Sequence, residues 1–180
     1  MGRPLSHRDL AYCGLFGAAA LLLPVLFHLV HLGHVFMPMY LPLVTLAFFV
    51  RPVPAAVTSL LTPLLSGLVT GMPSFYPPVA LFMSLELAAT TAAIALVVQR
   101  WPGANPWLVL APALTLGRVL YVGLVYFFSL AITLPATFMA GLSVVTGWPG
   151  VLLMLAVVPP VVRAGGRAVG FTGRRDGSVS

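Results

Sequence analysis

The chain is organised as long apolar stretches that are separated by short segments rich in Pro, Gly, Arg or Ser. The apolar stretches cover about residues 11–32, 40–50, 55–70, 79–98, 106–131 and 150–162. The first stretch is long enough to cross the ~30 Å hydrocarbon core of a bilayer as a helix. The second is short and flanked by prolines, so we expect a tilted or half-embedded helix there. The pattern predicts six helices, with a loop at residues 71–78, where Pro and Gly are dense.

The composition indicates that these helices face lipid. The 180 residues are 60% hydrophobic and 7% charged, and their mean hydropathy is +1.07. In soluble domains, by comparison, charged residues make up about 25%. So few polar side chains cannot cover the surface of a soluble protein, and the remaining apolar surface must face lipid. We therefore predict an all-α integral membrane protein with six transmembrane helices in a lipid bilayer and no soluble domain.

Positive charge is concentrated at the ends of the apolar stretches. The net charge of +6 would suggest nucleic-acid binding in a soluble protein. Here the arginine positions favour lipid headgroups, and we expect no nucleic-acid partner. An even number of spans places every flanking arginine on one side, which the positive-inside rule makes cytoplasmic. The flanking arginines are Arg3, Arg8, Arg51, Arg100, Arg163, Arg167, Arg174 and Arg175.

This orientation defines three regions with both termini in the cytoplasm. Residues 1–10 form the cytoplasmic N-terminus, and residues 11–163 form the six-helix membrane domain. Residues 164–180 are rich in Gly, Arg and Ser, a composition typical of disorder, and we expect a basic, disordered cytoplasmic tail.

Glu86 and Arg118 are the two charged residues inside apolar stretches. A charge at the centre of a membrane helix costs ~2.5–3.5 kcal/mol on insertion scales, so such residues usually face the protein interior and find a partner. Both lie in the middle or outer half of the predicted bilayer, so they can pair. One interpretation is an ion pair that only specifies the fold of a structural membrane protein. The other is a site that binds a polar solute, because Tyr121, Phe75 and Tyr76 supply aromatic groups nearby.

A run of histidines gives an alternative function. His28, His31 and His34 follow one another at intervals of three, which brings His28 and His31 within reach on a helix. Imidazole is a common ligand of transition metals. A metal-ion-binding uptake subunit is therefore an alternative hypothesis, although no acidic residue is near in sequence and apolar-flanked histidines more often serve packing.

Small residues near the start of the first stretch provide a packing face. Gly14 and Ala18 are four residues apart, a spacing that lets another helix approach closely. This face serves either packing within the chain or docking of a partner membrane protein.

The sequence has none of the residue patterns of an enzyme. It has no paired carboxylates, no nucleophile elbow and no phosphate-binding glycine loop. We therefore expect no catalytic residue, no cofactor and no ATP hydrolysis by this chain. The energy for uphill transport would come from a partner or an ion gradient.

Several stretches together resemble a known family of membrane proteins. They are PMYLPLVTLAFFVRP, TPLLSGLVTGMPSFYPP, MSLELA, LGRVLY and VTGWPGVLLMLAVVPPVV. In order and spacing they resemble the substrate-binding membrane subunits (S components) of energy-coupling factor (ECF) transporters, a type of ABC importer. The resemblance covers about residues 28–163.

The resemblance implies a role in vitamin uptake at the plasma membrane of a prokaryote. Members of this family have six transmembrane helices with both termini in the cytoplasm. They bind a vitamin or related micronutrient near the outer surface and dock onto one membrane coupling protein and two ATPases. The coupling protein contacts a small-residue face on the first helix, for which Gly14 and Ala18 are the matching residues. The subgroup looks like the pantothenate or cobalamin-precursor type.

The resemblance also implies a set of pocket residues. Tyr40 stands where close relatives usually have a histidine, which bears on the identity of the ligand. By position, the substrate-binding residues are His34, Tyr40, Ser66, Thr70, Phe75, Tyr76, Glu86, Arg118 and Tyr121.

Overall fold

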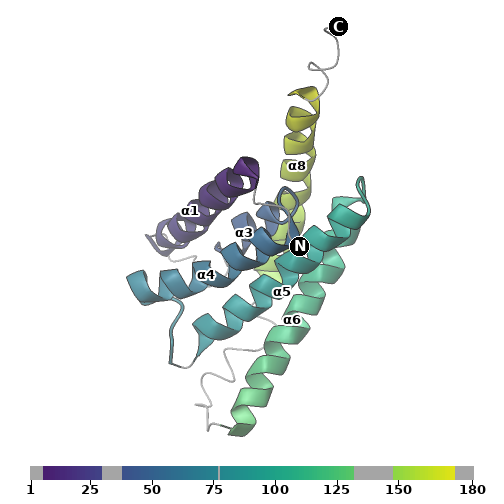
Figure 1. Ribbon diagram of the computed structural model, residues 1–180. Coiled ribbons are helices and arrows are strands. Elements are labelled where there is room, and N and C mark those ends of the chain that lie inside the picture. Colours follow the sequence, from purple (N-terminus) through teal and green to yellow (C-terminus); the bar gives the residue numbers. More distant parts are fainter. Residues whose placement is uncertain (1–5, 30–37, 77, 132–147, 173–180) are drawn as a thin grey trace, which may run out of the picture.

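The computed structural model describes residues 6–29, 38–76, 78–131 and 148–172, and this part of the chain contains helices and no strand (Figure 1). The helices are α1 (His7–Leu29), α3 (Tyr40–Leu46), α4 (Pro52–Thr70), α5 (Val79–Arg100), α6 (Pro106–Ala131) and α8 (Trp148–Thr172). The all-α prediction is confirmed, and each predicted apolar stretch corresponds to one of these helices.

Four helices are long and apolar enough to cross a membrane, namely α1, α4, α5 and α6. The apolar part of α8, Pro149–Gly165, is shorter, and α3 has only 7 residues. By length and composition these are the helices of a membrane protein. Four of the six predicted spans therefore have the length and composition to cross a membrane, whereas α3 is short and α8 has a shorter apolar part.

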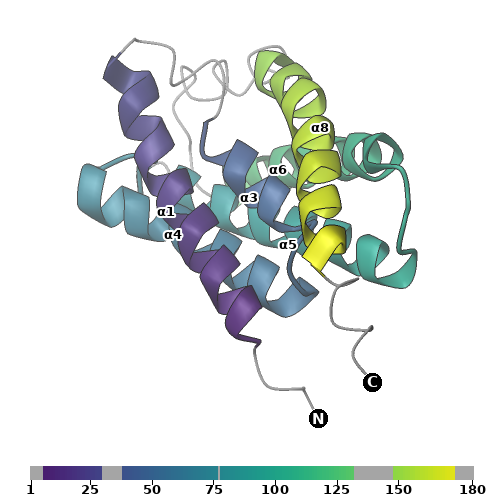
Figure 2. The same cartoon turned by 90° about the horizontal axis from the view of Figure 1, so that it is seen from above.

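The helices pack around α3. Helix α4 lies along α5, and α5 lies along α6, while α1 contacts both α3 and α4. Helix α8 contacts α3 and α6. Seen from above, α3 lies between α1 and α8, with α5 behind it (Figure 2). This short helix is therefore the centre of the bundle.

The side chains of α3 explain its position. Six of its 7 residues are buried, among them Leu43, Val44 and Leu46. A helix that is apolar on all sides is stable only in apolar surroundings. The other helices, rather than lipid, surround α3 here. The second apolar stretch is thus enclosed by the other helices, and its tilted or half-embedded position in a bilayer stays a prediction.

Proline and glycine set the ends of α4. The helix begins at Pro52, close to the predicted start at residue 55, because proline is tolerated in a first turn. It ends at Thr70, and the next residue, Gly71, has a φ of 75° and so adopts the left-handed conformation that closes many helices. Helix α4 therefore stops where the predicted loop begins.

Helix α8 ends at Thr172 rather than near residue 162, so it includes the first part of the segment that was predicted as a tail.

Gly165 of α8 lies in close contact with the segment after α3. A Cβ atom on Gly165 would lie 2.7 Å from Cζ of Phe49. Glycine here lets α8 pass directly against the Phe49 ring, which follows α3.

An ion pair ties α1 to the turn before α4. Nε of Arg51 lies 2.9 Å from Oδ2 of Asp9, whose side chain is only 10% exposed. A buried carboxylate needs such a partner, because burial removes its hydration. Tyr12 of α1 also stacks on Phe49, with ring centroids 5.6 Å apart.

Removal of this ion pair should weaken the fold measurably. Asp9→Asn should lower the free energy of unfolding by about 1–2 kcal/mol, because Arg51 loses a charged hydrogen-bond partner that is largely shielded from water. Thermal unfolding in detergent measures the change. Arg8→Gln is the matched control, since Arg8 is exposed on the same turn of α1. Equal stability of the two variants would mean that the pair does not hold these elements together.

The described arginines that flank apolar stretches gather at one end of the bundle. Arg51 binds the first turn of α1, and Gly165 of α8 meets Phe49 just before it. Arg163 in turn donates a hydrogen bond of 3.4 Å from Nη2 to Oδ1 of Asn105, which lies in the short turn after Arg100. These contacts place Arg51, Arg163 and the turn after Arg100 at one end of the bundle, and the assignment of this end to the cytoplasmic side stays a prediction.

Candidate functional site

Four polar or charged side chains from three helices meet inside the bundle. We call Tyr40 of α3, Glu86 of α5, and Arg118 and Tyr121 of α6 the polar cluster. The Tyr40 hydroxyl donates a hydrogen bond to Oε2 of Glu86. Glu86 is 3% exposed and Tyr40 is 4% exposed. This bond supplies one of the partners that a buried carboxylate requires.

Arg118 completes the cluster as its positive member. Its Cζ atom lies 5.7 Å from the centroid of the Tyr40 ring and 5.9 Å from that of the Tyr121 ring. Both distances are in the range of cation–π attraction. The guanidinium also attracts the Glu86 carboxylate electrostatically. Since Arg118 is only half buried, it is the most accessible charge of the cluster.

Gly117 allows α6 to approach α5 at this point. A Cβ atom on Gly117 would lie 2.4 Å from Oγ1 of Thr90 and 3.5 Å from Oε1 of Glu86. Thr90 lies one turn after Glu86, and its Oγ1 atom is buried without a hydrogen-bond partner among the described residues. Sequence reasoning missed Gly117, although a glycine next to a charged residue within an apolar helix is a signal of close packing.

An aromatic wall supports Tyr121. The Phe82 ring lies edge-on to the Tyr121 ring, with centroids 6.5 Å apart and an interplanar angle of 81°. Phe82 is fully buried and also contacts Phe128, with ring centroids 4.9 Å apart. Edge-to-face pairs attract each other beyond the contribution of burial. The Phe82 ring therefore holds the Tyr121 side chain of α6 in its place in the polar cluster.

Ser66 and Thr70, two of the predicted substrate-binding residues, close the end of α4. The Ser66 hydroxyl donates a hydrogen bond of 2.7 Å to the carbonyl of Met72. The Thr70 hydroxyl donates one of 2.8 Å to the carbonyl of Ser66. These bonds satisfy carbonyls at and beyond a helix end, so both hydroxyls already have a structural role.

Phe75 and Tyr76 lie in the loop between α4 and α5, and both are exposed. The Phe75 ring covers Gly67, since a Cβ atom there would lie 2.8 Å from Cε2 of Phe75. The structure thus separates the predicted site residues into two groups. Tyr40, Glu86 and Tyr121 of the polar cluster are buried and Arg118 is half buried, whereas the loop aromatics are exposed.

The histidine alternative falls largely outside the described residues. His31 and His34 lie outside them, and His28 is described only as part of the α1 backbone. Within the described part of the chain, no group of three His, Cys, Asp or Glu side chains could hold a metal ion. The metal-binding hypothesis therefore stays a prediction.

Gly14 and Ala18 lie on the outward face of α1. A Cβ atom on Gly14 would meet nothing within 4 Å, whereas one on Gly17 would lie 3.5 Å from Cγ2 of Thr58 on α4. Packing against the rest of the chain uses Gly17 and the fully buried Ala20. Both residues of the small-residue pair are thus exposed in the described part of this chain.

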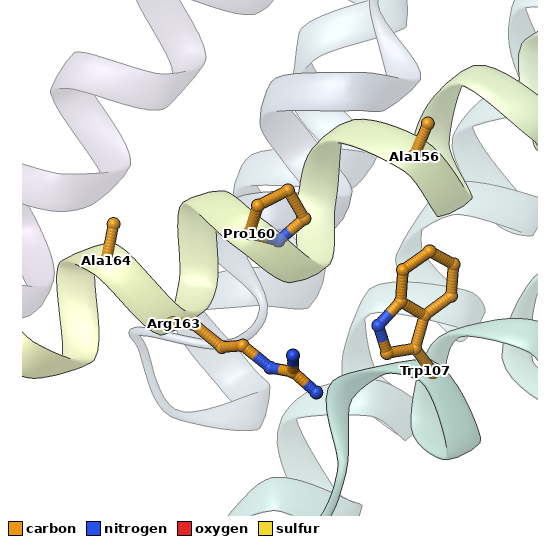
Figure 3. Close-up of a pocket in the computed structure, with 5 residues that line it drawn as sticks. All are labelled: Trp107, Ala156, Pro160, Arg163 and Ala164. Atoms are coloured by element: carbon orange, nitrogen blue, oxygen red, sulfur yellow. The ribbon is translucent and has the colours of Figure 1, made fainter.

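A groove with a volume of about 350 Å³ lies between the first turn of α6 and the middle of α8 (Figure 3). The Trp107 indole and the Arg163 guanidinium both extend toward the space between the two helices (Figure 3). The groove lies at the arginine-rich end and is separate from the polar cluster. Its lining residues are Trp107, Ala156, Pro160, Arg163 and Ala164.

Comparison of the chain with protein-family models, with curated protein sequences and with solved structures gives no match.

Proposed function

We propose that this chain is the substrate-binding subunit of an ECF-type importer and captures a vitamin or related micronutrient, of the pantothenate or cobalamin-precursor kind. The observation that carries the proposal is the polar cluster within helices that are otherwise apolar. Ionisable residues in membrane helices are expensive to insert and usually mark a pathway or site for a polar solute. The family resemblance supplies the type of solute.

The chemistry of the cluster suits a small polar ligand. Arg118 offers a planar guanidinium, which binds carboxylates through two parallel hydrogen bonds. Tyr40 and Tyr121 offer flat apolar faces, and Glu86 is an acceptor for hydroxyl groups. A few polar groups within aromatic walls are the usual lining of a small-molecule site. Because Arg118 is half buried while Glu86 is enclosed, a solute would meet the guanidinium first.

The outward face of α1 supports docking to a coupling protein. Gly14 and Ala18 would let a helix of that protein approach closely, because neither presents a large side chain. Only 6% of the α1 span is buried within the chain, against 33–44% of the other three spans. The two ATPases of the module would then supply the energy. The arginine-rich end would face the cytoplasm, at the inner plasma-membrane surface of a prokaryote.

Two measurements test the proposal. Mass spectrometry of small molecules released from the purified protein should identify one vitamin-like compound. Titration of that compound into protein freed of it should then show tight binding without ATP. Absence of any bound compound, together with no response to pantothenate or to cobalamin precursors, would favour a purely structural role.

A charge-conserving substitution should locate the site. Arg118→Lys keeps the positive charge but removes the planar group that lies against two tyrosine rings. We expect about tenfold weaker ligand binding, which corresponds to ~1.4 kcal/mol. Arg163→Lys, the same change outside the cluster, should leave the affinity unchanged. Wild-type affinity in the Arg118→Lys variant would place the ligand elsewhere.

A further inference from the structure

The groove between α6 and α8 combines one charge with an apolar floor. Arg163 and Ala164 lie at one end of its α8 wall, and Ala156 lies two turns away. That distance is about 12 Å along the helix axis, enough for part of one acyl chain. Trp107 forms the facing wall and is 41% exposed. Tryptophan with an exposed ring is typical of the level at which lipid headgroups meet hydrocarbon.

The Arg163 guanidinium is exposed and has no acidic partner among the described residues. Its hydrogen-bond partner Asn105 is a neutral amide, at 3.4 Å. Of the described acids, Asp9 pairs with Arg51, and Glu86 belongs to the polar cluster. Neither acid therefore compensates the Arg163 guanidinium. Arg100, over the Trp101 ring at 5.7 Å, adds positive charge at the same end of the bundle.

We propose that this groove binds one anionic phospholipid. The phosphate contacts the Arg163 guanidinium, and one acyl chain lies along Trp107, Ala156 and Pro160. Basic grooves between membrane helices on the arginine-rich side are suited to such headgroups. The proposal uses no residue of the polar cluster, so it stands or fails independently of vitamin binding.

Native mass spectrometry of the full-length protein in detergent tests the lipid preference. Phosphatidylglycerol should bind about fivefold more tightly than phosphatidylcholine with the same acyl chains, since one juxtamembrane arginine contributes about that factor. Arg163→Gln should abolish this preference. Arg100→Gln is the matched control, because it removes an equal charge at the same end but outside the groove, and it should keep most of the preference. Equal loss in both variants would reduce the effect to general attraction and overturn the site.

Fluorescence locates the bound lipid. Trp101→Phe combined with Trp148→Phe leaves Trp107 as the single tryptophan. Phosphatidylglycerol with brominated acyl chains should quench Trp107 more strongly than brominated phosphatidylcholine, and Arg163→Gln should remove the difference. Excess inorganic phosphate should not relieve the quenching. Relief by phosphate would show a site for the free anion, and equal quenching by both lipids would contradict the proposal.

Discussion

Replacing Arg118 with Met should lower the free energy of unfolding by about 3 kcal/mol, the largest effect we expect from a single substitution. The Glu86 carboxylate would stay buried beside Tyr40 after losing the positive charge that attracts it. Removing the positive charge next to a buried carboxylate is strongly destabilising, because the carboxylate is left uncompensated. Met preserves much of the apolar volume of the arginine side chain, so the effect reports mainly on charge.

A double-mutant cycle isolates this electrostatic contribution. In a Glu86→Gln background the carboxylate charge is absent, so Arg118→Met should destabilise much less than in the wild-type protein. Arg163→Met makes the same chemical change at an exposed position and is the control. Thermal unfolding in one detergent compares all variants. If Arg118→Met costs the same with Glu86 and with Gln at that position, the two side chains do not interact.

This cycle also separates the two interpretations of the charged pair. A pair that only specifies the fold predicts coupled stability and no ligand effect. A solute site predicts, in addition, that ligand raises the unfolding temperature of the wild-type protein far more than that of Arg118→Lys. The two measurements together therefore decide between a structural pair and a binding site.

Gly117→Ala should destabilise the protein by about 2 kcal/mol, the second large effect. The added methyl group would lie 2.4 Å from Oγ1 of Thr90 and 3.5 Å from Oε1 of Glu86. Overpacking of this kind forces side chains from their preferred rotamers or moves the helices apart. Since α5 and α6 contact each other along much of their length, separation at Gly117 would also disturb the polar cluster.

A glycine on the same helix provides the control. Gly123 of α6 is exposed, and a Cβ atom there would meet nothing within 4 Å. Gly123→Ala should therefore be neutral or slightly stabilising, because alanine favours helix more than glycine does. Thr90→Ala should rescue Gly117→Ala by removing the clashing oxygen atom. Failure of this rescue would show that the close approach is not what makes Gly117 necessary.

Composition and apolar length were enough to predict the helices. Each predicted stretch corresponds to a helix, since the repeated punctuation by Pro and Gly marked their boundaries. The central position of α3 could not be predicted, because an apolar segment has the same pattern whether lipid or protein surrounds it. The extent of α8 was also missed, since the contact of Gly165 with Phe49 depends on residues far apart in sequence.

The candidate site was predicted in part. Glu86 and Arg118 stood out because charges within membrane segments need partners, and the structure brings both into one cluster with Tyr40 and Tyr121. The hydroxyls of Ser66 and Thr70 gave no such indication of their role. A serine near a helix end can bind a ligand or a nearby carbonyl, and only the three-dimensional contacts distinguish the two. Gly117 was missed because its role depends on the absence of a side chain, which leaves room for Thr90 and Glu86 of α5.

The short length of α3 limits the distance between a solute bound at Tyr40 and the arginine-rich end of the bundle. A helix of 7 residues rises only about 10 Å, a third of the ~30 Å hydrocarbon layer. Tyr40, the first residue of α3, donates a hydrogen bond to the Glu86 carboxylate, and the chain after the last residue of α3 continues to Arg51. A molecule bound beside Tyr40 would therefore be separated from the arginine-rich end of the bundle by little more than the length of α3.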